Sequence, residues 1–148
     1  MCTAQECPKL RLAKGDYIKT DDGILVRVVA DCAFDERQVH TDLGVIESHY
    51  PNILIDEGVI KACGFKYDKN HANFKVKIDD DIVIISIDFP SCVVKDIKIL
   101  GPKYSLDNIP QSNRGWCVLS DLQDTIRELS GNELPIDEES LRKIIFNK

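Results

Sequence analysis

Long apolar runs are missing from this chain of 148 residues, and their absence limits where it can work. No uncharged apolar stretch approaches the roughly 18 residues that suggest a membrane-spanning helix. Residues 1–12 carry polar side chains where a secretory signal peptide would need its apolar stretch. We therefore expect a cytosolic protein without membrane association.

An excess of positive charge is also missing. Nineteen Lys and Arg residues stand against twenty-five Asp and Glu residues, which gives a formal net charge of −6. Proteins that coat a phosphate backbone carry the opposite balance, so general nucleic-acid binding is disfavoured. The length and the 43% of hydrophobic residues fit one compact domain. We expect it to cover residues 10–148, after a flexible tail over residues 1–9.

Ligand pairs with the spacing of a structural zinc site are absent as well. The chain has six cysteines, but it contains no CxxC, HxxxH or CxxH pair, and only Cys2 and Cys7 lie close together. Because the other spacings are long and a signal peptide is missing, we expect free thiols rather than disulfides. Cys63 and Cys92 fall inside apolar patterns and are predicted in the core. Neither a metal nor a cofactor is expected.

The common catalytic motifs are missing too. The sequence has no phosphate-binding P-loop, dinucleotide-binding GxGxxG, zinc-binding HExxH or GxSxG nucleophile elbow, which favours a non-enzymatic protein. The alternative is a small hydrolase or nucleotide-processing enzyme that uses His and Asp residues of the 31–50 segment. Clustering of His40, His49 and the carboxylates of Asp31, Asp35 and Glu36 in one pocket would favour that alternative. Cys32 or Cys117 beside a histidine would be a second route to an enzyme.

The first part of the chain shows strand and turn signals. Asp22-Gly23 between two β-prone runs predicts a β-hairpin over residues 16–30. The segment 31–51 fits either a long loop or one short strand at 44–46. Asp56 is a suitable N-cap for a short helix, and Gly64 stands where a left-handed residue would end it, with Phe65 packing back.

The middle of the chain predicts three antiparallel strands, over residues 73–78, 82–89 and 92–100. The second strand is apolar on both faces, which is typical of a central strand covered on both sides. The run of aspartates at 79–81 predicts a solvated turn. Residues 101–116 show no sustained period and predict a long surface loop, a kind of segment that often carries function.

Two helices are expected at the end of the chain. Ser120 and Gln123 form a capping-box pattern, and Gly131 closes the first of these helices. Asp137 opens the second, whose apolar side chains lie on one face. The predicted fold class is therefore α+β: an N-terminal β-hairpin or small barrel, a short helix, a three-stranded antiparallel meander and two C-terminal helices.

The order of these segments resembles a family of uncharacterised small proteins from Bacteroidetes and their phages. The matching positions are the hairpin that starts at Lys14, the segment from Ile55 to Phe65 and the segment from Val118 to Leu134. The resemblance leaves out residues 31–50 and the last helix. Ser120 and Asp121 stand where the family has His-Gln, so no role of that histidine carries over. The resemblance implies a phage or mobile-element setting and no activity.

A basic run between the short helix and the second strand is the first candidate binding site. Its lysines are interleaved with Tyr67, His71 and Phe74, a composition that suits a phosphate or a nucleotide base. The structural alternative, which the sequence favours, is a strand whose edge lysines prevent unwanted pairing. The candidate binding residues of this run are Lys66, Lys69, Lys75 and Lys77.

The loop over residues 103–116, before the first of the two C-terminal helices, is the other candidate. Tyr104, Arg114 and Trp116 are residue types that anchor interfaces. The structural alternative places Trp116 on the core at the entry to the helix. Together these features predict a non-enzymatic accessory protein of a phage or mobile element, acting in host takeover or anti-defence. The expected partner is a protein of the bacterial host, because the acidic chain can meet basic surfaces on such a protein, or else a small nucleotide.

Overall fold

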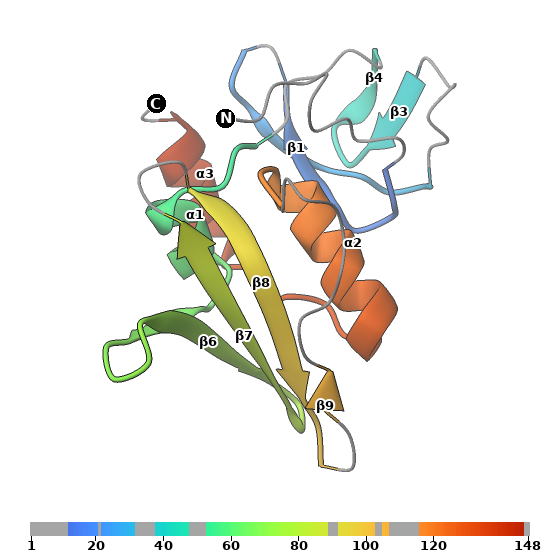
Figure 1. The fold of residues 1–148 in the computed structure, drawn as a ribbon. Helices are drawn as coiled ribbons and strands as arrows, with labels where there is room; N and C mark the ends of the chain where they lie inside the picture. The colour runs from blue at the N-terminus through green and yellow to red at the C-terminus, as the bar shows by residue number, and fades with distance from the viewer. Residues whose placement is uncertain are drawn as a thin grey trace.

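The computed structural model is a mixed fold of three antiparallel sheets and three helices, which confirms the α+β class (Figure 1). The described residues are 12–20, 22–31, 38–47, 53–88, 92–102, 105–106 and 116–146. The tail predicted over residues 1–9 lies outside them. None of the helices is long and apolar enough to cross a membrane, over the residues that the structure describes.

The largest sheet has five antiparallel strands in the order β5-β6-β7-β8-β9. The predicted three-stranded meander is its centre, and one short strand extends the sheet at each edge. The five strands are β5 (Lys66–Asp68), β6 (Asn73–Ile78), β7 (Asp81–Asp88), β8 (Val93–Leu100) and β9 (Ser105–Leu106).

The N-terminal hairpin is confirmed. Strand β1 (Tyr17–Lys19) pairs with β2 (Leu25–Arg27), and the turn between them is closed by a hydrogen bond from the Gly23 N–H to the Thr20 carbonyl. Gly23 has a φ of +81°, the left-handed conformation that the Asp-Gly pair predicts. A small apolar cluster below the hairpin holds it together.

The segment 31–51 contains more structure than the sequence indicated. Strand β3 (Gln38–Thr41) pairs with β4 (Gly44–Glu47), so a complete hairpin stands where a loop or a single strand was expected. Each strand has only four residues and mixes polar with apolar side chains, so the pattern of the sequence alone does not predict the pair. Thr41 also forms a bridge to Val28, which connects this hairpin to the first one.

All three helices pack on one face of the large sheet, here called its inner face. Phe74 and Val76 from β6, and Val83 and Ile85 from β7, join a core cluster that includes apolar side chains of each helix. The expectation that β7 is covered on both faces is wrong. Ile82 on the opposite face is 37% exposed, because no described helix packs there.

Helix α1 (Glu57–Ala62) begins and ends as predicted. The Asp56 carboxylate accepts a hydrogen bond of 2.8 Å from the Val59 N–H and caps the first turn. Gly64 has a φ of +93°, and the Phe65 N–H bonds back to the Ile60 carbonyl, the pattern of a Schellman end. The buried Phe65 side chain then directs the chain into β5.

Helix α2 (Leu119–Ser130) does not begin with the predicted capping box. Its N-cap is Val118, which makes no side-chain capping bond and instead forms a β-bridge with Leu54. Residues 116–118 lie between β8 and residues 53–55, held by backbone hydrogen bonds on both sides. Sheet pairing therefore sets the start of the helix at Leu119. Gln123 lies one turn further on and is buried, so it does not act in a capping box. Gly131, at a φ of +75°, ends the helix as predicted.

Helix α2 also anchors the N-terminal hairpin (Figure 1). The Gln123 side chain accepts a 2.9 Å hydrogen bond from the Tyr17 N–H and donates one of 3.1 Å to the Gly15 carbonyl. Arg127 contacts the fully buried Asp16 at 3.2 Å and also binds Asp124 and Glu133. A buried charge of this kind is tolerated only with such partners.

Helix α3 (Glu138–Phe146) confirms the last predicted element. The Asp137 carboxylate accepts a hydrogen bond from the Ser140 N–H, so it caps the helix that it was predicted to open. Leu141 and Ile145 are buried in the main core, where α3 packs on α1.

Two predictions about polar and thiol groups need correction. Asp81 is 7% exposed and accepts a 3.0 Å hydrogen bond from the Asn132 side chain, so the aspartate turn is solvated at Asp79 and Asp80 but not at Asp81. Cys63 is buried as predicted, but Cys92 is only half-buried. It occupies the turn before β8 with a φ of +59°, outside the regular strand.

The contact between Gly15 and the Arg127 ion pairs can be tested by a matched pair of substitutions. A Cβ added at Gly15 would lie 2.8 Å from Glu133 Oε1, whereas one added at Gly23 would meet nothing within 4 Å. Both residues have positive φ, so alanine costs each about 1–2 kcal/mol of backbone strain. We expect Gly15→Ala to lower the free energy of unfolding by about 1 kcal/mol more than Gly23→Ala, measured by denaturant titration. Equal losses would contradict this packing.

Candidate functional site

The outer face of the large sheet, opposite the helices, carries the candidate site. Strand register places side chains from four strands in two parallel rows. The first, the cationic row, crosses the sheet through the pairs Lys66–Lys75, Lys75–Ile84 and Ile84–Lys98, and the second, the acceptor row, holds Asp68, Asn73, Ser86 and Asp96. The rows stand two residues apart along the strands, which is about 7 Å.

A hollow of about 320 Å³ lies over these rows and extends past the cationic row to Leu100. Its polar lining comes from His71, Asn73, Lys75, Ser86, Asp96 and Lys98, and its apolar lining from Ile84 and Leu100. The Oδ1 atom of Asn73 is buried and has no hydrogen-bond donor among the described residues. Buried polar atoms are normally hydrogen-bonded, so this atom stands out.

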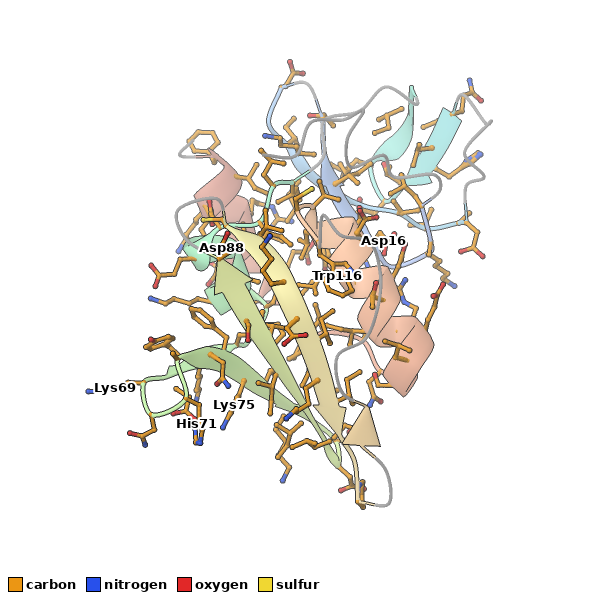
Figure 2. The ribbon with its side chains drawn as sticks, viewed as in Figure 1. Asp16, Lys69, His71, Lys75, Asp88 and Trp116 are labelled. Atoms are coloured by element: carbon orange, nitrogen blue, oxygen red, sulfur yellow. The ribbon has the colours of Figure 1, made fainter. Side chains whose placement is uncertain are left out.

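Asp68 organises one side of the hollow. Its Oδ2 atom lies 2.7 Å from Lys75 Nζ and 2.8 Å from His71 Nδ1, and its Oδ1 atom accepts a hydrogen bond from the Asn70 N–H. The hydrogen bonds from Lys75 and His71 hold the pKa of the Asp68 carboxyl well below its usual range, and the one from Lys75 has the larger effect. Figure 2 shows His71 and Lys75 near the β5–β6 turn, close to Lys69.

The predicted basic run is therefore divided between two faces. Lys66, Lys75 and Lys77 lie on the outer face, and Lys69 is exposed in the turn beside them. The aromatic residues of the run do not join them. Phe74 is buried in the core, and the ring of Tyr67 packs against it at a centroid distance of 5.1 Å on the inner side. The base-stacking surface that the sequence suggested is not formed by these two rings.

Trp116 packs in the core, as the structural alternative predicted, and is not an exposed interface anchor. It is 2% exposed, forms a backbone bridge with Val94 of β8, and donates a 2.8 Å hydrogen bond from its ring N–H to the Thr125 hydroxyl on α2 (Figure 2). A ring held in this way is not available as an exposed anchor. Tyr104 and Arg114, the other candidates of that loop, lie outside the described residues.

The enzyme alternative finds little support among the residues that the structure describes. His40 is exposed on β3, and the Asp31 carboxylate accepts a hydrogen bond from the Lys14 N–H, while Asp35, Glu36 and His49 fall outside the described ranges. No group of three or more His, Cys, Asp or Glu side chains in the described segments could hold a metal ion. Burial raises the pKa of Cys63 to about 12, so this thiol is a poor nucleophile.

A second and wider hollow, of about 650 Å³, lies along α3. The described part of its lining comes from that helix alone. Its charged residues already pair with one another along the helix, as Arg142 does with Glu138 and Lys143 with Glu139. The hollow on the sheet, which combines side chains of three strands and a turn, is the better-built site.

No protein-family model, curated protein or solved structure matches this chain.

The Asp68 contacts make a testable prediction about pH. Replacing Lys75 with alanine removes the strongest cause of the lowered pKa, so we expect the Asp68 pKa to rise toward the ordinary value of about 3.9. Carboxyl-carbon NMR titration of the full chain measures this, with Lys77→Ala, two residues along the same strand, as the control. An Asp68 titration that Lys75→Ala leaves in place would contradict the contact.

The sign of the effect on stability follows from the same shift. Because the folded pKa lies below the unfolded one, Asp68 stabilises the fold at pH values above about 3.9, and this contribution is lost as pH falls toward the folded pKa. The difference in unfolding free energy between the natural chain and Asp68→Asn should therefore shrink on acidification.

Proposed function

We propose that the chain is a non-enzymatic accessory protein that binds an acidic surface of a host protein through the outer face of its large sheet. One observation carries this proposal. A chain with a net charge of −6 concentrates Lys66, Lys75 and Lys77 on neighbouring strands of one open face.

The strand register makes this clustering of lysines unfavourable for the stability of the sheet. Lys66 and Lys75 stand directly opposite each other, and like charges opposed across a strand pair destabilise a sheet. Asp68 compensates Lys75 through a 2.7 Å ion pair, but the exposed Lys66 and Lys77 still present their charges to solvent. A carboxylate-rich partner would relieve that repulsion and would be steered toward the face by it.

An acidic protein surface fits this face better than a nucleotide does. A nucleotide base is commonly held by stacking on an aromatic ring, and Tyr67 and Phe74 face the other way. The setting in a phage or mobile element, with host takeover or anti-defence as its purpose and the bacterial cytosol as its place, rests on the family resemblance alone. The neighbouring genes would test that setting.

Charge reversal tests the binding face. Lys66→Glu with Lys77→Glu changes the net charge by −4, and so does the control pair Lys61→Glu with Lys143→Glu, at exposed lysines of α1 and α3. A protein captured from host lysate by the natural chain is purified and its affinity measured by calorimetry at two salt concentrations. We expect the sheet variant to bind about tenfold more weakly, the control to bind normally, and salt to weaken binding.

Equal affinities of the two double variants would overturn the proposal, because the same change of net charge would then have the same effect wherever it is placed. Binding that does not respond to salt would also contradict it.

A further inference from the structure

Asp68 holds His71 at the edge of the outer face through both the backbone and the side chain of the histidine. The Asp68 carbonyl accepts a 3.3 Å hydrogen bond from the His71 N–H, and Asp68 Oδ2 lies 2.8 Å from His71 Nδ1. Ala72, the next residue, has a φ of +54°, a conformation that alanine rarely adopts. The turn therefore fixes the position of the imidazole ring, although the side chain is 64% exposed.

One oxygen atom of Asp68 contacts two basic side chains. Lys75 Nζ lies 2.7 Å from the same Oδ2 atom that His71 Nδ1 contacts. Because the hydrogen bonds from Lys75 and His71 keep the pKa of Asp68 well below its usual range, this carboxylate stays ionised wherever a histidine titrates. An ionised carboxylate only accepts hydrogen bonds, so Nδ1 carries the proton of the neutral ring, and acidification adds a proton at Nε2.

Protonation of His71 changes the charge of this cluster. With a neutral ring, the charges of Asp68 and Lys75 cancel, and the exposed Lys66 and Lys77 supply the positive charge of the face. With a protonated ring, the Asp68 carboxylate has two cations at one oxygen atom, and the cluster carries one net positive charge. Asp68 then holds Lys75 less firmly. Histidine is the side chain that ordinarily changes its charge between pH 5 and 8.

The other charged groups around His71 do not reverse this change. Lys69 belongs to the same turn, and it adds a further cation (Figure 2). Asp96 and Lys98 of β8 line the same hollow as His71, and their opposite charges cancel. A carboxylate-rich partner on the outer face therefore meets more positive charge when the ring of His71 is protonated.

We propose that His71 makes binding at the outer face sensitive to pH, so that the face binds its acidic protein partner more tightly when Nε2 is protonated. This inference rests on the proposed binding of a host protein and adds how that binding is regulated. Linkage makes the effect reciprocal, because a partner that prefers the protonated chain also draws a proton onto His71 when it binds. One added charge at an exposed site changes an affinity only a few fold.

Calorimetry with the purified host protein at pH 5.5 and 7.5 tests the inference, in buffers of different ionisation enthalpy that also report proton uptake. The amide of His71→Asn replaces the Nδ1 donor and stays neutral, and His40→Asn, at the exposed histidine of β3, is the matched control. We expect the natural chain and the control to gain about threefold in affinity at pH 5.5 relative to His71→Asn, and to take up more protons on binding. The same pH dependence and proton uptake in all three chains would show the inference to be wrong.

A measurement on the free chain tests the shared oxygen atom without the partner. The acetylation rate of Lys75 is divided by that of Lys77, two residues along the same strand, so that the common effect of pH on amines and reagent cancels. Because protonated His71 competes for Asp68 Oδ2, we expect this ratio to rise about twofold from pH 7.5 to 5.5 in the natural chain. It should stay constant in His71→Asn. A constant ratio in the natural chain would overturn the inference.

The two proposals can fail separately. A host protein whose binding responds to pH identically with the natural chain and with His71→Asn would remove the regulation by His71 and leave the binding face. Equal affinities of the two charge-reversed double variants would remove the binding face, whereas a rising acetylation ratio would still show that His71 controls the pairing of Lys75 with Asp68.

Discussion

Among the described residues, helices bury only one face of the five-stranded sheet, and this is the constraint on which the rest of the structure depends. The apolar residues of β6, β7 and β8 that face the helices form one core with α1, α2 and α3. Their neighbours along each strand must then point away from the core, because side chains alternate between the two faces. The outer face therefore holds the polar residues of these strands together with Ile82, Ile84 and Leu100, and pairing across the strands arranges the polar ones in a cationic row and an acceptor row.

A second set of contacts fixes the N-terminal strands to this core. Gln123 binds the backbone on both sides of Asp16, and Arg127 binds the Asp16 carboxylate itself. Polar groups buried in this way favour one arrangement, because an alternative docking would cost the buried Asp16 carboxylate its ion pair with Arg127. The same helix holds Trp116 through Thr125, so α2 connects the small hairpin, the large sheet and the segment that joins them.

Local signals explain which parts of the fold the sequence could predict. Gly23, Gly64 and Gly131 mark a turn and two helix ends through a conformation that each residue adopts by itself. The hydrogen bond between Gln123 and Tyr17 spans 106 residues, and nothing near Gln123 in the sequence distinguishes it from a capping residue. The site shares this difficulty. Its lysines were visible as a run, but their separation from Tyr67 and Phe74, and their opposition to Asn73 and Asp96, depend on strand register, where a shift of one residue exchanges the faces.

The proposed binding on the outer face of the sheet can be measured directly by acetylation of surface lysines, mapped by mass spectrometry with and without the purified host partner. We predict that binding protects Lys66, Lys75 and Lys77 and leaves Lys61 and Lys143, on α1 and α3, as reactive as before. Protection of Lys61 and Lys143, with the sheet lysines unchanged, would contradict the account.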